Sequence, residues 1–205
     1  DWILENYAAG QSWLDLGTFT NADGNEQLFG LFYKVDVKSL VWYLPGNFAE
    51  AGYDVPQTME ELLALSEQIV EDGGTPWCIG LGSGDATGWP ATDWVEDILL
   101  RTAEPSVYDA WITNELAFDD PVIVNALEIF GQFAKQEAWV NGGVDTVATT
   151  DFRESPLGLF TEEPGCFMHR QASFIPSNFP DRGAELAEGV ADFFYFPPFE
   201  EQELG

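Results

Sequence analysis

Residues 57–81 read QTMEELLALSEQIVEDGGTPWCIGL and hold a helix start, a helix stop and a buried strand in direct succession. Thr58 and Glu61 form a capping-box pattern, in which the hydroxyl and the carboxylate satisfy free backbone amides at the helix N-terminus. An apolar stripe follows at helical spacing, and the glycine pair 73–74 ends it. Residues 77–81 are typical of a buried strand. This stretch therefore predicts a helix that leads into a strand.

Helices and strands alternate along the rest of the chain. Four more segments have the β-branched and aromatic residues of extended chain: 29–33, 37–43, 166–169 and 192–196. Three more have helical patterns: 90–101, 121–140 between an Asp N-cap and an Asn-Gly-Gly stop, and a short one near 173–179. The alternation predicts an α/β lobe in which helices cover a parallel or mixed sheet and ligands bind at the strands' carboxyl ends.

The composition is that of a folded and strongly acidic protein. The 205 residues are 45% hydrophobic and 15% aromatic, and 36 acidic against 7 basic residues give a formal net charge of −29. Such a charge repels nucleic acid and anionic lipid, so we expect neither as a partner. The N-terminal residues lack the pattern of a secretion signal, so either the protein is cytosolic or a signal is missing. We expect truncation at both ends.

The usual catalytic and cofactor motifs are missing from the sequence. The glycine-rich run 82–88 has neither P-loop nor dinucleotide spacing, and no Gly-x-Ser-x-Gly elbow occurs. His169 is the one histidine and lies in an apolar strand, which favours a buried structural imidazole. Two widely spaced cysteines and one histidine offer no paired zinc ligands. We therefore expect no catalytic residue, no metal and no cofactor, and Cys78 and Cys166 are either two buried thiols or one disulfide.

Tryptophan is the remaining chemical signal. Seven of the eight tryptophans exceed what packing alone requires: Trp13, Trp42, Trp77, Trp89, Trp94, Trp111 and Trp139. An indole offers an apolar plate to the C–H face of a sugar, while carboxylates, amides and arginines bind the hydroxyls. Trp89 is the best placed of them, because it follows the glycine-rich run at a helix start with Asp93 one turn on.

Several runs of this sequence resemble carbohydrate ABC-transporter extracellular solute-binding proteins. In the family signature, a crossing strand is followed by a short helix, a proline and a capped helix. The matching runs here are VWYLP at 41–45, AGYDVP at 51–56, QTMEEL at 57–62 and GGTPW at 73–77. The α-glucoside-type branch is resembled by FYKVDVKS at 32–39, GWPATDW at 88–94 and CFMHRQASF at 166–174. The resemblance covers most of the chain.

The resemblance implies a periplasmic-binding-protein-like fold of two α/β lobes that close over a ligand. Residues 1–34 would end the first lobe, and residues 35–205 would form the hinge and most of the second, sugar-binding lobe, with its C-terminal part missing. The implied function is non-enzymatic capture of an α-glucoside disaccharide or oligosaccharide for the membrane permease of an ABC importer. The implied location is extracytoplasmic, in the periplasm or lipid-anchored. A secreted glycoside hydrolase or transglycosidase is the main alternative, and an acidic structural or adhesive domain is a third.

The resemblance also implies which residues bind the sugar. Carried over position by position, they are Trp89, Asp93, Arg170, Gln171, Ser173, Phe174, Lys34 and Asp36. In this assignment the Trp89 indole stacks on a sugar ring and the polar side chains bind its hydroxyls. The exported setting implied by the resemblance also favours a Cys78–Cys166 disulfide.

Overall fold

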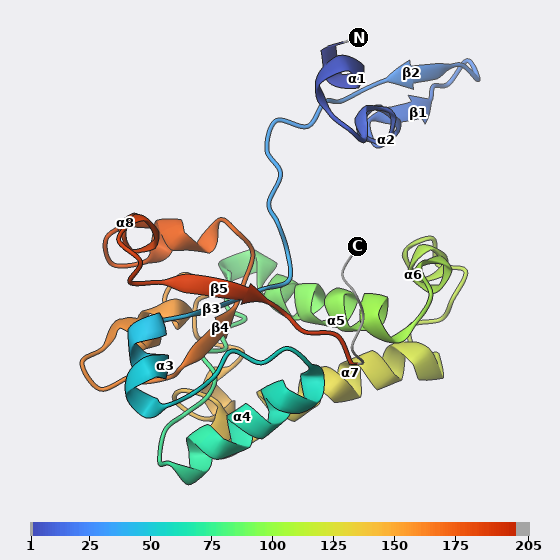
Figure 1. The fold of residues 1–205 in the computed structure, drawn as a ribbon. Coiled ribbons are helices and arrows are strands. Elements are labelled where there is room, and N and C mark those ends of the chain that lie inside the picture. Colours follow the sequence, from blue (N-terminus) through green and yellow to red (C-terminus); the bar gives the residue numbers. More distant parts are fainter. Residues whose placement is uncertain (1, 200–205) are drawn as a thin grey trace. The chain divides into compact units, whose positions relative to one another are not determined.

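The computed structural model describes residues 2–199, which fall into two compact units (Figure 1). Unit 1 ends at Asp36 and unit 2 begins at Val37. None of the helices within residues 2–199 is long and apolar enough to cross a membrane.

Unit 1 is small and leaves most of its apolar side chains exposed. It contains helices α1 (Trp2–Asn6) and α2 (Gly10–Asp15) and an antiparallel hairpin of β1 (Thr18–Thr20) and β2 (Glu26–Leu28). Among its described residues, Gly10 alone is buried. The strand that we predicted at 29–33 is wrong in position, because β2 ends at Leu28.

Unit 2 contains the sheet and the longer helices. Its elements are β3 (Leu40–Tyr43), α3 (Pro45–Ala51), α4 (Met59–Glu71), η1 (Gly84–Ala86), α5 (Trp89–Thr102), α6 (Pro105–Ile112), α7 (Pro121–Ala134), η2 (Glu137–Trp139), η3 (Val144–Thr146), η4 (Ser155–Phe160), β4 (Met168–Arg170), η5 (Ile175–Asn178), α8 (Ala184–Ala187) and β5 (Asp192–Tyr195).

The sheet of unit 2 differs from the parallel or mixed sheet that we predicted. Its three regular strands run in the order β4-β3-β5 and are antiparallel, with Val41 paired to Arg170 on one side and to Phe194 on the other. The predicted strand at 77–81 is an extended segment that forms parallel bridges at its ends, from Trp77 to Met168 and from Gly82 to Asp151. The predicted α/β class is thus confirmed.

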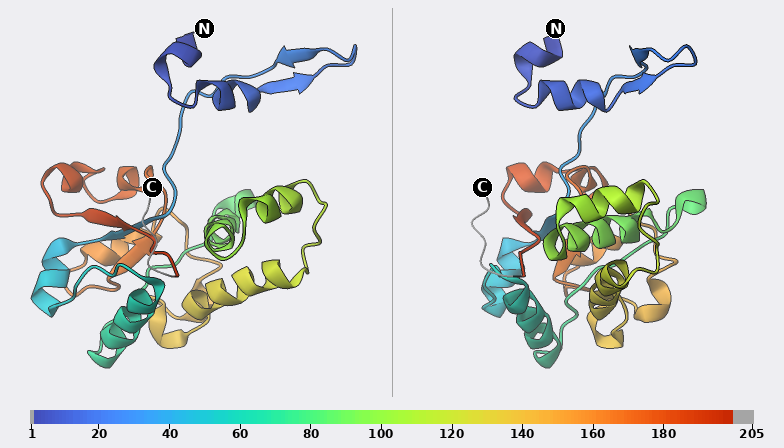
Figure 2. Two further views of the ribbon diagram at one scale, coloured as in Figure 1. Left: turned by 45° about the vertical axis from the view of Figure 1, so that its right-hand side comes forward. Right: turned by 90° about the vertical axis from the view of Figure 1, so that its right-hand side faces the viewer.

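Two apolar clusters cover the two faces of this sheet. Helices α4, α5 and α7 pack on the face of Val41, with Ile69, Trp94 and Phe133 in the first cluster. Segments η4 and η5 pack on the face of Trp42, and the second cluster includes both cysteines. Figure 2 shows α5, α6 and α7 on one side of the sheet. Four of the tryptophans that we regarded as an excess over packing are in fact buried in these clusters: Trp42, Trp77, Trp94 and Trp139.

Local signals in the sequence account for the longer helices. The capping box of α4 is present, because Glu61 N donates to Thr58 Oγ1 and Thr58 N donates to a Glu61 carboxylate oxygen. Helix α5 is one residue longer at each end than predicted. Helix α7 begins after its Asp120 cap but ends at Ala134, before the predicted stop. The chain turns early because backbone bonds hold residues 139–141 against Trp77.

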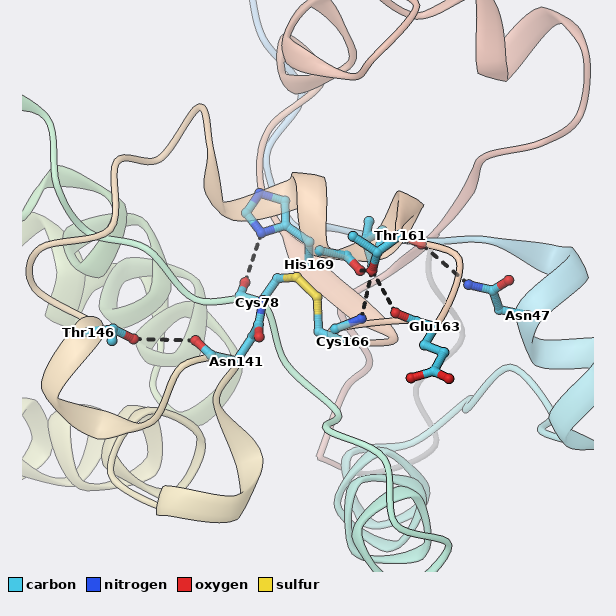
Figure 3. Close-up of a disulfide and its surroundings, with 11 residues drawn as sticks. Asn47, Cys78, Asn141, Thr146, Thr161, Glu163, Cys166 and His169 are labelled. Carbon is cyan, nitrogen blue, oxygen red and sulfur yellow. Dashed lines mark hydrogen bonds between the residues drawn. A yellow bond between two sulfur atoms is a disulfide. The ribbon is translucent and has the colours of Figure 1, made fainter.

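A disulfide joins the extended segment of unit 2 to the chain just before β4 (Figure 3). Cys78 and Cys166 have Cα atoms 5.5 Å apart and are bonded through sulfur, so the predicted proximity of the two residues is confirmed. Cys78 N donates to Met168 O, at 2.8 Å, in the same region. Gly158 packs so closely here that a Cβ on it would lie 2.9 Å from either sulfur.

The disulfide is expected to contribute strongly to stability, because it closes a loop across a sequence separation of 88 residues. The double substitution Cys78→Ala/Cys166→Ala should lower the free energy of unfolding by about 4 kcal/mol. Urea denaturation of the full-length protein measures this change. Reduction of the unmodified protein with a thiol serves as the control and should produce a similar loss; an unchanged urea midpoint after complete reduction would contradict the expectation.

Candidate functional site

Trp89 stands at the first position of α5, directly after the glycine-rich run. Gly88 adopts φ 107°, a left-handed conformation that favours glycine, and its amide donates to Leu81 O at 2.9 Å. The carbonyl of Gly88 in turn accepts from Thr92 N at 3.2 Å, within the first turn of the helix. The loop therefore returns to the extended segment and fixes where the helix begins.

The Trp89 ring belongs to an aromatic trio with Phe152 and Phe174. The ring centroids are 5.0 Å apart for Trp89 and Phe152, 5.9 Å for Trp89 and Phe174, and 6.0 Å for the two phenylalanines. Phe152 is buried, whereas Trp89 and Phe174 are partly exposed. Three segments that are distant in sequence thus form one aromatic surface with a buried base.

Charged side chains border this trio. Lys38 Nζ lies 2.6 Å from Asp93 Oδ2 and 5.6 Å from the centroid of the Trp89 ring. On the other side, the Arg153 guanidinium lies 4.3 Å from the Phe152 ring centroid and 3.3 Å from the carboxylate of Asp151. The aromatic trio therefore has two cationic donors, Lys38 and Arg153, and two carboxylate acceptors, Asp93 and Asp151, close to it.

A buried ion network lies one helical turn further along α5. The Asp97 carboxylate is bound by Arg170, whose Nε and Nη2 lie 3.1 and 2.5 Å from Oδ2, and by Arg101. Ser39 Oγ donates to the other carboxylate oxygen at 2.5 Å. Arg170 Nη2 also donates to the carbonyl of Asp93, at 2.8 Å. The buried guanidinium of Arg170 therefore binds the helix backbone at Asp93.

Comparison with known proteins assigns the chain to a family. The model of the bacterial extracellular solute-binding protein family matches residues 1–161. The chain belongs to this family. Membership confirms the predicted family, fold class and extracytoplasmic location.

Two curated relatives are much longer than this chain. The chain is 60% identical over all 205 residues to the alpha-glucosides-binding periplasmic protein AglE of Rhizobium meliloti, of which it covers 44%. It is 46% identical over 192 residues to the osmoprotective compounds-binding protein GgtB of Synechocystis, covering 94% of this chain and 44% of GgtB. The chain thus spans less than half the length of these relatives.

Solved structures share the fold at low sequence identity. The bacterial solute receptor AcbH superposes with a TM-score of 0.67 at 21% identity, covering 98% of this chain and 45% of AcbH. A structure from work on xylan utilization by Caldanaerobius polysaccharolyticus gives a TM-score of 0.69 at 17% identity, covering 99% of this chain and 48% of that one. Both likenesses concern the fold alone.

The structure brings together only some of the residues that the resemblance implied. Trp89, Asp93 and Phe174 lie at the aromatic trio, and Ser173 is next to it in sequence. Ser173 Oγ accepts from Val37 N at 2.9 Å, so its hydroxyl also anchors the backbone.

Arg170 and Gln171 differ from the expectation that their side chains meet a ligand. Both are buried. The guanidinium of Arg170 is occupied by Asp97 and by the Asp93 carbonyl, as described above. The Gln171 side-chain carbonyl accepts from Ala172 N at 3.0 Å. In this structure both side chains bind other groups of the core, and their contact with a ligand stays a prediction.

Lys34 and Asp36 lie in unit 1, whereas the aromatic trio lies in unit 2. The two side chains form an ion pair with each other at 3.2 Å. Their contact with a ligand stays a prediction.

Sequence reasoning missed Lys38, Phe152 and Arg153. Lys38 lies within the run at 32–39 that resembles the family, yet nothing local marks its contact with a residue 55 positions away. No group of acidic, histidine or cysteine side chains within residues 2–199 could hold a metal ion.

His169 is buried, as the sequence predicted, and its environment favours the neutral ring. Its Nδ1 lies 2.8 Å from Cys78 O (Figure 3). The pKa of His169 is lowered from 6.5 to about 4, mainly by burial and also by nearby Arg170, against the opposing effect of the bond to Cys78 O. The imidazole is therefore uncharged at neutral pH.

The lowered pKa of His169 makes stability depend on pH. The unfolded chain binds a proton near pH 6.5 and the folded chain only near pH 4, so stability falls as the pH drops through this window. Between pH 7 and 5.5 the imidazole should account for a loss of about 1 kcal/mol. Urea denaturation at the two pH values, compared with the His169→Gln variant, isolates this loss from that of the carboxylates. An identical pH dependence in both proteins would refute the assignment.

Proposed function

We propose that the chain contains the sugar-binding part of a solute-binding protein that captures an α-glucoside for an ABC importer. One observation carries the proposal: the partly exposed Trp89 forms an aromatic surface with Phe174, and the Lys38–Asp93 pair lies at its edge. An aromatic plate with a polar rim suits a ring that has apolar C–H faces and hydroxyl edges. The extracytoplasmic family supports the same reading.

The α-glucoside class is the finer part of the proposal. Its support is the 60% identity to AglE over all 205 residues of this chain. AglE is named for binding alpha-glucosides. We propose a disaccharide or oligosaccharide of this class as the ligand and the importer's membrane permease as the protein partner.

The two units support a division between two lobes. Unit 1 has hardly any buried residues, whereas unit 2 has two apolar clusters. We propose that residues 1–34 end the first lobe and that residues 35–205 form the hinge and the second lobe. Closure of such lobes over a ligand is a common hinge motion, and the closed form would dock on the permease.

Truncation of the aromatic plate tests the proposal. Trp89→Ala in the full-length protein should weaken maltose binding at least tenfold, because the stacking surface is lost while the buried base of the trio remains. Isothermal titration calorimetry measures the affinity, and a thermal melt of the same variant shows whether the fold is kept. Unchanged affinity would overturn the proposal for Trp89.

Trp111→Ala is the matched control for Trp89→Ala. Trp111 is also partly exposed in unit 2, but its ring contacts Tyr108 and Phe118 instead of the aromatic trio. This variant should bind maltose as the unmodified protein does. Cellobiose, which has a β-linkage in place of the α-linkage, is the ligand control and should bind more weakly than maltose.

A glycoside hydrolase would use the same aromatic residues and carboxylates, so capture without reaction is the second proposal to test. The relatives named above are binding proteins, which supports capture. Full-length protein incubated with maltose should leave the sugar intact in chromatography, and the sugar should raise the melting temperature by mass action. Release of glucose at a rate that scales with protein concentration would favour the enzyme.

A further inference from the structure

Lys38 contacts both the aromatic and the acidic part of the proposed sugar site. Its ammonium is 2.6 Å from the Asp93 carboxylate and 5.6 Å from the Trp89 ring centroid. Cations are attracted to an aromatic face within about 6 Å of its centroid. Lys38 is within this range while it binds Asp93, so a sugar ring that contacts Trp89 would have an ammonium and a carboxylate close to its hydroxyls.

The backbone on both sides of Lys38 is held in place. Before it, Val37 exchanges two hydrogen bonds with Ser173, one to the hydroxyl and one from the amide, both 2.9 Å long. After it, Ser39 donates to Asp97, and its carbonyl accepts from the backbone just beyond β5 at 2.7 Å. Ser39 has φ 65°, which is uncommon for a residue other than glycine and here is held by these bonds. The side chain of Lys38 therefore extends from a fixed point.

The two partners of this ion pair differ in exposure. The side chain of Asp93 is 12% exposed, whereas that of Lys38 is 50% exposed. The carboxylate is thus a fixed acceptor, and the ammonium is a donor that can adjust to a ligand without disturbing the core. Lysine has three donor hydrogens, so one bond to Asp93 leaves others for a ligand.

Basic residues are scarce in this chain and are concentrated around this site. The seven are Lys34, Lys38, Arg101, Lys135, Arg153, Arg170 and Arg182. Four of them lie against the aromatic trio or against the acidic residues of α5: Lys38, Arg101, Arg153 and Arg170. Arg101 and Arg170 neutralise Asp97 in the core, whereas Lys38 and Arg153 contact the aromatic trio itself.

We propose that Lys38 and Asp93 together recognise two neighbouring hydroxyls of the sugar that stacks on Trp89, which makes Lys38 a specificity-determining residue. The inference rests on the proposed function. A hydroxyl donates one hydrogen bond and accepts others, so an ammonium beside a carboxylate complements two adjacent hydroxyls. Hydrogen bonds to charged groups are the stronger ones. A site built on them rejects an analogue that lacks the hydroxyl.

Calorimetric titration of the full-length protein with maltose and its monodeoxy derivatives tests the inference. The unmodified protein should bind two derivatives, deoxygenated at adjacent carbons, at least tenfold more weakly than maltose. Lys38→Met should weaken maltose binding about tenfold and remove the penalty at one of these two positions. Asp93→Asn should reduce the penalty at the other. Lys135→Met, the same change at an exposed lysine after α7, should leave affinity and pattern unchanged.

The outcomes separate this inference from the function on which it rests. If the unmodified protein binds no α-glucoside, both fall. If it binds maltose and Trp89→Ala weakens binding, but Lys38→Met keeps the original affinity or the original deoxy pattern, this inference alone is wrong. Should Lys38→Met melt at a lower temperature, Lys38→Arg decides the matter. Arginine keeps the charge but has a different donor geometry. Lys38→Arg should therefore change the loss of affinity for the same one monodeoxy derivative. An unchanged loss of affinity for that derivative overturns the inference.

Discussion

The buried carboxylate of Asp97 is the contact on which the arrangement of the site depends. It is 6% exposed and lies between the guanidinium groups of Arg170 and Arg101, with the Ser39 hydroxyl as a further donor. Burying a charge is costly unless partners satisfy it, and removing one partner of a buried pair typically costs about 3–5 kcal/mol. These contacts join α5 to β4 and to the first residues of unit 2, and Arg101 also donates to Phe196 O beyond β5.

The same network also fixes the helix that carries Trp89 and Asp93. Because Arg170 binds both Asp97 and the carbonyl of Asp93, it fixes the half of α5 that begins at Trp89. The aromatic trio then depends on Phe152, which follows the bridge between Gly82 and the chain at residue 151. Buried charges thus hold the helix, while Lys38 is exposed and Trp89 is partly exposed, as the proposed role in ligand recognition requires.

Features with local causes could be predicted from the sequence, and features with long-range causes could not. The capping box of α4, the start of α5 and the Asp120 cap of α7 depend on residues within one turn. The end of α7 depends on pairing with the distant segment at Trp77, and α6 was missed although Pro105 stands at its start. The family resemblance named Trp89, Asp93 and Phe174, which the fold brings together. Burial of Arg170 and the approach of Lys38 required the fold, because a sequence does not tell which acidic residue a cation will meet.

The central claim is that Trp89 and its charged border form the surface that receives a sugar. A crystal structure of the full-length protein with maltose tests it most directly. The account predicts a glucose ring stacked on the Trp89 indole, with hydroxyls within hydrogen-bond distance of Asp93 and Lys38. A structure in which maltose binds elsewhere, or in which another segment of the protein covers Trp89 while maltose is bound, would contradict it.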